Sequence, residues 1–462
     1  MKRTGKFTTA IITGCFLLLL AGCSKEPPAL QSLPQTQKEN VPEQTLASAP
    51  ITQEDITALM SDDEKSWMNL TTADYLEDFD YLYQAMKDNY PYFGVVKRKV
   101  GLDIETEYQK TREIVGRCSN DHEYWQTVRA FIRSLDYTGH ISAWGTRYST
   151  ELESTYEFIE IYPQYAEHYA PYIQALENPA SHQFYSGLET FLEVVESRMP
   201  PEEEPEESAI PEESVTSDLS SGNIVTDIIE DNHIAYISIA GMDMMAYEQD
   251  RDDLLAFYRE VADYDHLIID ITQNGGGGMS YYSDLVVAPN IDQPLSVNVY
   301  CLIKDGTIVH DFLITPGLDE WKPINELPEL PNINREDLAQ MAYFTDEPYT
   351  IEPSGEGRIF QGKIWLLVSE YNYSSSEYAA MFSKHSGFAT LVGAQTGGDG
   401  IGTDPIYIIL PHTGLVIQFS PIYGISQDGT GSEEYGTTPD HFHNPGETAL
   451  EACLRLITNQ TE

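Results

Sequence analysis

The sequence predicts an α/β fold in which a helical N-terminal region precedes a core with a largely parallel sheet. From residue 223 onward, apolar runs typical of buried strands alternate with amphipathic helical segments, as in residues 266–272 (HLIIDIT) and 363–370 (KIWLLVSE). Before residue 199, apolar residues recur instead at the spacing of one helix face, as in residues 72–90. Strands that alternate with helices pair most simply in parallel, because each helix carries the chain back across the sheet.

The first 22 residues have the pattern of a secretory signal peptide. Three basic residues within the first six precede an apolar run at 10–20, which is too short to remain as a membrane-spanning helix. Residues 20–23 (LAGC) then resemble the lipobox of bacterial lipoproteins, in which the cysteine thiol is lipidated and becomes the new N-terminus. The pattern predicts an extracytoplasmic protein anchored to a bacterial membrane through Cys23. The alternative is an ordinary signal peptide with a cysteine near its cleavage site by chance.

Composition divides the rest of the chain into four parts. Residues 23–50 are rich in Pro, Gln and Ser and predict a flexible tether. Residues 51–198 are expected to form an N-terminal helical domain with a Tyr-rich helical insert. Residues 199–222, where Pro and Glu dominate, predict an acidic linker. Residues 223–462 contain the alternation of strands and helices and are expected to form the core.

The net charge of the chain, −48 at neutral pH, bears on its partners. Such an acidic protein is repelled by the phosphates of nucleic acids, so nucleic acid is not expected as a partner. His441 and His443 are spaced like metal ligands, but two histidines without a third ligand are more often surface residues. We therefore expect neither a metal nor a cofactor, and the oligomeric state stays open.

Two segments about 100 residues apart carry the functional signal. Gly275–Gly278 follow a buried strand, where a glycine backbone can approach a ligand closely and present N–H groups to an anion. The run lacks the spacing of a dinucleotide-binding motif. Ser374–Ser376 begin a predicted helix, where serines are usually N-caps, although a nucleophile there would gain from the helix dipole. Neither segment identifies a site by itself.

Together and in this order, the segments resemble the core of the C-terminal-processing and tricorn-type serine peptidases. In that family one strand ends in Asp-x-Arg-x-Asn-Gly-Gly-Gly, a second leads to Ser-Ala-Ser-Glu or Ser-Ala-Ala-Glu, and a Gly-Glu-x-Thr-x-Gly loop follows. The matching residues here are Asp270, Asn274, Gly275 and Gly276, then Ser374 to Glu377, then Gly393, Thr396 and Gly398, with Thr272 where arginine is common. The resemblance covers most of residues 70–200 and 223–458 and implies a crotonase/ClpP-like core.

The resemblance implies a nucleophile and a choice between two bases. Ser374, three residues before a glutamate, has the position of the nucleophile. One branch of the family uses a lysine about 25 residues further on, but residues 397–400 here are Gly-Gly-Asp-Gly, and Asp399 cannot replace a neutral amine. The other, tricorn-type branch uses a histidine and a glutamate, so the sequence favours that branch.

His140 and Glu433 match the histidine and the glutamate of the tricorn-type branch. Imidazole suits general-base work because it titrates near neutral pH, and a carboxylate behind it can set its tautomer. In that branch a serine precedes the histidine and relays to the glutamate, but Gly139 has that position here. Whether Glu433 reaches His140 directly, through water or through another hydroxyl therefore stays open.

An oxyanion hole would complete the site. The backbone N–H of Ser375, at the start of its helix, is one expected donor, and the N–H of Gly275 or Gly276 is the other. These residues would stabilise the negative charge that develops on the substrate oxygen when Ser374 attacks.

The function predicted from these observations is an extracytoplasmic, lipid-anchored serine peptidase. It would hydrolyse peptides or protein tails through an acyl-enzyme, and it is expected to lack a PDZ domain because residues 150–222 show no such strand pattern. The main alternative is a non-catalytic lipoprotein that uses the same fold to bind a peptide or another ligand. A solute-binding lipoprotein of a transporter is a third and weaker alternative.

The lipobox pattern leads to a first prediction. Replacing Cys23 by Ser removes the thiol that would carry the lipid, so the Cys23→Ser variant should move from the membrane fraction to the soluble secreted fraction. Fractionation of cells followed by immunoblotting measures this change. A variant that still sediments with membranes would place the anchor elsewhere.

Overall fold

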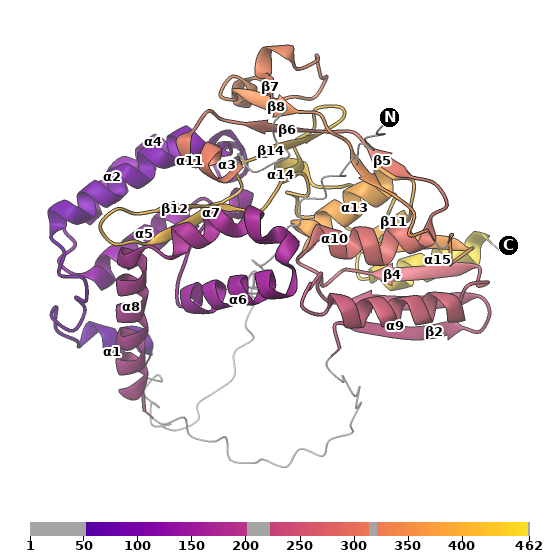
Figure 1. Ribbon diagram of the computed structural model, residues 1–462, viewed down its shortest axis with the longest axis horizontal. Coiled ribbons are helices and arrows are strands. Elements are labelled where there is room, and N and C mark those ends of the chain that lie inside the picture. The colour runs from indigo at the N-terminus through magenta and orange to yellow at the C-terminus, as the bar shows by residue number, and fades with distance from the viewer. Residues whose placement is uncertain (1–51, 201–221, 314–320, 356, 461–462) are drawn as a thin grey trace, which may run out of the picture.

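The computed structural model describes residues 52–200, 222–313, 321–355 and 357–460. The predicted signal peptide, Cys23, the tether and most of the acidic linker lie outside these residues. Within them, no helix is long and apolar enough to cross a membrane. The described part has two regions in Figure 1, one rich in helices and one built on a sheet with helices on both faces.

A six-stranded sheet, here called the central sheet, forms the core of the second region. Its strands lie in the order β15-β11-β10-β4-β3-β2, and all neighbours are parallel except β2 and β3, which form a hairpin. The strands are β2 (Ile224–Glu230), β3 (Ile234–Ile239), β4 (His266–Asp270), β10 (Lys363–Val368), β11 (Thr390–Gly393) and β15 (His441–Phe442). The predicted α/β fold with a largely parallel sheet is confirmed.

Helices cover both faces of the central sheet, because alternate side chains of each strand point to opposite faces. Trp365 and Leu367 of β10 pack with Cys453 of α15 (Ala449–Gln460) on one face. Leu366, between them, joins the large core that includes residues of α9 (Tyr247–Glu260) and α13 (Ser375–Ser386) on the other face. A strand buried on both faces reads as the continuous apolar run seen in the sequence.

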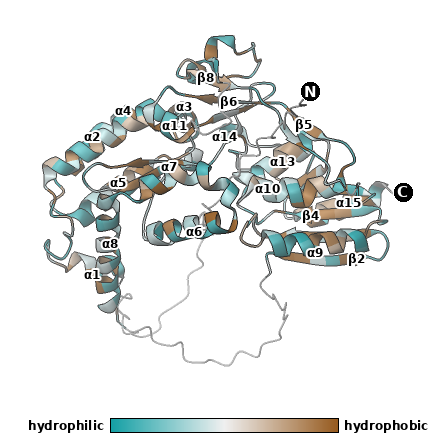
Figure 2. Cartoon of the chain, in the orientation of Figure 1, coloured by the Kyte–Doolittle hydropathy of each residue, from teal (hydrophilic) through white to brown (hydrophobic). Residues whose placement is uncertain are grey.

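The N-terminal region is helical, as its periodicity predicts. Hydrophobic and hydrophilic residues alternate along α2 in Figure 2, as expected of a helix with one buried face. Its helices are α1 (Gln53–Ala58), α2 (Thr72–Asn89), α3 (Phe93–Lys99), α4 (Ile104–Val115), α5 (Asp121–Arg133), α6 (Arg147–Ile161), α7 (Ala166–Leu176) and α8 (Pro179–Ser197).

A hairpin from late in the chain completes the N-terminal region. Its strands β12 (Ile406–Ile409) and β13 (Val416–Phe419) are antiparallel, and β13 also pairs with β1 (Ser142–Ala143). In Figure 1 this hairpin lies among the helices of the N-terminal region rather than on the central sheet. Residues 51–198 and 223–462 therefore interlock in space.

Smaller elements surround the central sheet. One four-stranded sheet has the order β14-β6-β8-β7, and β5 pairs with β9. These elements and the short helices between them are β5 (Leu295–Val297), β6 (Val299–Ile303), β7 (Lys322–Pro323), β8 (Tyr343–Thr345), β9 (Tyr349–Ile351), β14 (Tyr423–Ser426), α10 (Met279–Tyr282), α11 (Thr307–Leu313), α12 (Arg335–Leu338) and α14 (Ser432–Tyr435).

Asp78 of α2 holds the turn of the β12–β13 hairpin, and this contact gives a second prediction. Its buried carboxylate accepts from the N–H of His412 (2.8 Å) and from the N–H and hydroxyl of Thr413 (2.8 and 2.6 Å). Asp78→Ala leaves these donors unpaired and should lower the free energy of unfolding by about 2–4 kcal/mol in urea titrations. Glu77→Ala is the matched control, because Glu77 contacts the same His412 from an exposed position and should cost about 1 kcal/mol or less. Equal losses in the two variants would contradict this account.

Candidate active site

The two loops singled out in the sequence lie side by side. The strands that precede them, β4 and β10, are parallel neighbours in which Asp270 is opposite Leu367, so both loops start at the same edge of the central sheet. The Nδ2 of Asn372 and the hydroxyl of Ser376 both donate to the carbonyl oxygen of Asn274, at 3.0 and 2.8 Å. The glycine run is therefore fixed against the start of α13.

Ser374 occupies a sharp turn between β10 and α13. It is the residue before the first helical residue, and its φ of 61° and ψ of −127° are rare for a residue with a side chain. Its N–H donates to the carbonyl oxygen of Gly398 at 3.1 Å. A backbone held in such a conformation stores strain and is typical of functional sites.

His140 comes from the N-terminal region and shares a small pocket with Ser374. It lies at the end of a short 3-10 turn (Thr138–His140), between α5 and β1, and it lines one small pocket together with Ser374 and Ser375. The carbonyl oxygen of Gly139 accepts from the N–H of Ser420 (2.7 Å), which fixes this turn beside the end of β13. Residues 234 positions apart in the chain thus share one pocket.

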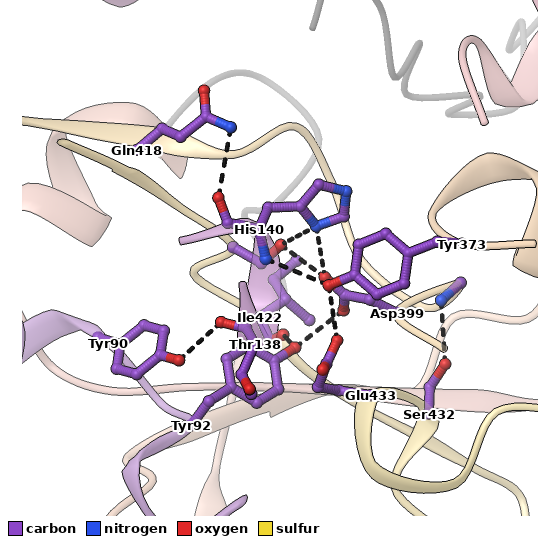
Figure 3. A network of polar contacts seen from close by, with 12 residues as sticks. Tyr90, Tyr92, Thr138, His140, Tyr373, Asp399, Gln418, Ile422, Ser432 and Glu433 are labelled. Carbon is purple, nitrogen blue, oxygen red and sulfur yellow. Dashed lines mark hydrogen bonds and ion pairs between the residues drawn. The ribbon is translucent and has the colours of Figure 1, made fainter. Parts of the chain in front are cut away.

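The imidazole of His140 contacts a carboxylate that the sequence did not suggest as its partner. Nδ1 of His140 lies 2.7 Å from Oδ2 of Asp399 and 3.0 Å from the hydroxyl of Ser420, as Figure 3 shows. Asp399 was predicted only to be unable to act as a base in place of lysine. The sequence signal for Asp399 is its position between two glycines. Glycines let a loop backbone pack closely against its neighbours, which can bring the residue between them into a site.

His140, Ser374 and Asp399 share an unusual backbone conformation. Seven non-glycine residues of the described part of the chain have a positive φ, and these three are among them, at 56°, 61° and 56°. Such conformations persist only where the surroundings hold them. Three residues with such conformations line one pocket, which indicates that the surrounding structure fixes their positions at some cost in folding stability.

Glu433 is also buried, but its carboxylate makes no hydrogen bond with the imidazole of His140. Its Oε2 accepts from the hydroxyl of Tyr373 (2.7 Å), and its Oε1 accepts from Nζ of Lys99 (3.1 Å). The same Tyr373 hydroxyl accepts from the backbone N–H of His140 at 3.2 Å, so the connection to His140 runs through a hydroxyl to the backbone rather than to the imidazole (Figure 3). Burial, and then the charge of Asp399, raise the pKa of Glu433 to about 7.

The backbone N–H groups of Gly275 and Gly276 differ in whether they are already hydrogen-bonded within the loop. The N–H of Gly276 donates to Oδ1 of Asn274 at 2.8 Å, so this donor is already used within the loop. Gly275 is exposed, and a Cβ built there would meet nothing within 4 Å. Ser375 begins α13, where the helix dipole favours negative charge. The loop that carries both glycines is thus held against the start of α13, where Ser375 lies, and Gly275 is the freer of the two glycines.

In the described ranges, no group of three or more His, Cys, Asp and Glu side chains is placed to hold a metal ion. His441 lies exposed on β15, the edge strand of the central sheet, and His443 follows it.

A serine at the start of a helix, beside a histidine that contacts a carboxylate, is the arrangement of a serine hydrolase. Residues 233–442 match the model of peptidase family S41, which agrees with the resemblance to the C-terminal-processing and tricorn-type peptidases seen in the sequence. A comparison with curated proteins finds no match.

Solved structures are similar to this chain over most of its length. A candidate peptidase from Parabacteroides merdae is 17% identical, with a TM-score of 0.50 over 84% of this chain and 97% of its own. Mature CPAF complexed with lactacystin is 13% identical, with a TM-score of 0.49 over 84% of this chain and 97% of its own.

The glutamate of the Ser-x-x-Glu motif gives a third prediction. Burial raises the pKa of Glu377 to about 7, and its Oε2 has no hydrogen-bond partner among the described residues. A raised carboxyl pKa contributes stability below the ordinary value of 4.5, and this contribution is lost as the pH rises towards 7. The stability of Glu377→Gln relative to the parent should therefore rise between pH 5 and pH 8, measured as unfolding midpoints in urea. A difference that does not change with pH would contradict the raised pKa.

Proposed function

We propose that this chain hydrolyses peptide bonds through an acyl-enzyme on Ser374, with His140 as the general base. The observation that carries the proposal is that both side chains line one pocket, each held in a strained backbone conformation. Because Nδ1 of His140 is engaged by Asp399 and Ser420, the other ring nitrogen, Nε2, is left to accept the proton of the Ser374 hydroxyl.

The proposed reaction has an acylation step and a deacylation step, and His140 transfers the proton in both. Oγ of Ser374 attacks the scissile carbonyl while its proton passes to Nε2 of His140. The imidazolium returns this proton to the leaving amine as the C–N bond breaks, which gives the acyl-enzyme and a free amino terminus. A water molecule, deprotonated by the same nitrogen, attacks the ester, and the imidazolium then gives this proton to Oγ of Ser374 as the ester bond breaks and the acid product leaves.

The N–H groups of Ser375 and Gly275 are proposed to hold the developing oxyanion. Ser375 follows Ser374 at the start of α13, and Gly275 is in the loop that Asn372 and Ser376 fix against this helix. Preorganised backbone donors of this kind cost no rearrangement when charge develops.

The proposal includes the place of action. The N-terminal pattern that ends in Cys23 supports export and a lipid anchor on a bacterial membrane, with residues 23–50 as the tether. Substrates would be peptides or protein tails that reach this surface. A non-catalytic binding lipoprotein on the same fold is the second candidate, supported by Gly139 in place of the family's serine and by the missing lysine.

Reaction with a fluorophosphonate probe separates the two candidates and is a fourth prediction. The parent protein should be labelled at Ser374, and Ser374→Ala should abolish labelling. His140→Ala should slow labelling by about 10³-fold or more, since the hydroxyl loses its base. Labelled peptides identified by mass spectrometry give the site.

Ser386→Ala is the matched control, because Ser386 is at the opposite end of α13 and its hydroxyl donates to the carbonyl oxygen of Phe382. Its labelling should equal that of the parent. A folded parent protein that is not labelled would support the binding lipoprotein instead.

A further inference from the structure

The carboxylate of Asp399 is held in one orientation by two hydroxyl groups and one imidazole, which come from three parts of the chain. Its Oδ2 accepts from the hydroxyl of Ser420 (2.8 Å) and lies 2.7 Å from Nδ1 of His140. The hydroxyl of Tyr92 lies 3.0 Å from its Oδ1 and also donates to the carbonyl oxygen of Ile422. The side chain is 2% exposed, so these contacts are made away from bulk water. A buried carboxylate with both oxygens occupied has little freedom to turn away from the imidazole.

The loop that carries Asp399 is fixed to the loop that carries the nucleophile. The carbonyl oxygen of Gly398 accepts from the N–H of Ser374, and the N–H of Gly400 donates to the hydroxyl of Ser432 at 3.0 Å. A Cβ at Gly398 would lie 2.7 Å from the carbonyl oxygen of Ser432, and one at Gly400 would lie 2.5 Å from the N of Tyr378. The loop is therefore packed between α13 and α14, and Asp399 and Ser374 keep their relative positions.

Tyr92 explains why a glycine precedes His140. Gly139 has a φ of 62°, and a Cβ there would lie 2.3 Å from Cδ2 of Tyr92. The aromatic ring thus fills the space that a side chain at position 139 would need, and its hydroxyl donates to Asp399 instead. In this chain, the hydroxyl that contacts the imidazole of His140 belongs to Ser420 rather than to a serine at position 139.

Glu433 lies on the other side of Tyr373 from His140. Its two carboxylate oxygens are taken by the hydroxyl of Tyr373 and the ammonium of Lys99, and Tyr373 touches His140 through the backbone N–H. The ring of Tyr373 packs against the imidazole with centroids 4.7 Å apart. Glu433 is thus positioned to hold Tyr373, whereas Asp399 contacts the atom that decides the tautomer.

We infer that Asp399 is the positioning residue of the general base, and that Glu433 supports the site from behind Tyr373. This inference rests on the proposed peptidase function. Asp399 accepts a hydrogen bond from the protonated Nδ1 of His140, which leaves the lone pair of Nε2 to face the hydroxyl of Ser374. When Nε2 takes the serine proton, the carboxylate stabilises the imidazolium without itself taking a proton. Ser420 and Tyr92 keep the carboxylate in place throughout.

The test compares Asp399→Asn with Glu433→Gln, two changes that keep side-chain size and remove one charge. Asparagine tolerates the positive φ of position 399, so the fold should be kept. Asp399→Asn should lower kcat/KM on a peptide substrate by about 10³–10⁴-fold, because the amide no longer selects the tautomer with the proton on Nδ1. Glu433→Gln should lower it by about tenfold or less. The rate of fluorophosphonate labelling should follow the same order.

A spectroscopic measurement distinguishes positioning from a merely structural role. ¹⁵N NMR of the histidines should show His140 protonated on Nδ1 in the parent and in Glu433→Gln, and shifted towards Nε2 protonation in Asp399→Asn. Asp265→Asn is the matched control, because Asp265 also lies 2.8 Å from a histidine Nδ1, that of His233, but just before β4, at the opposite end of this strand from the glycine run. Its kcat/KM should equal that of the parent.

Two outcomes would overturn the inference. A reactive parent whose Asp399→Asn variant keeps its rate and its tautomer would refute the role of Asp399 while leaving the proposed function intact. A Glu433→Gln variant that loses more activity than Asp399→Asn would assign the role to Glu433. A folded parent that neither cleaves peptides nor reacts with the probe would instead refute the proposed function itself.

Discussion

The hydrogen bond between His140 and Asp399 joins parts of the chain that are 259 residues apart, and the candidate site exists only while it is made. Its neighbours bridge the same two parts: Gly139 and Ser420 are hydrogen-bonded through their backbones, and β1 pairs with β13. The central sheet supplies Ser374 and the glycine run, but the histidine arrives with the helical region. Docking of the two regions is therefore a condition for chemistry as well as for stability.

Much of the fold could be predicted because it has local causes. A strand buried on both faces, such as β10, must be apolar throughout, and the helices between such strands must have one apolar face. The place of residues 406–419 could not be predicted in this way. Their apolar pattern fits any buried strand, and nothing local states that β13 pairs with β1 rather than with the central sheet.

Some residues of the candidate site could also be predicted from local motifs, and others could not. Ser374, the glycine run and His140 could be placed from motifs in one order along the chain, and the structure brings them around one edge of the sheet and one pocket. Asp399 could not, because its role depends on Tyr92 and Ser420, which approach from distant elements. A loop that supplies a lysine in one branch of the family carries an acid here. The role of Glu433 stays a prediction.

The pairing of β1 with β13 also sets an order of events during synthesis. A chain made from its N-terminus contains His140 long before it contains the β12–β13 hairpin, so β1 has to wait for its partner strand. Contacts this far apart in sequence form late and slowly. A nascent chain would therefore keep His140 away from Ser374 until residues 406–419 have been made and the hairpin can pair with β1.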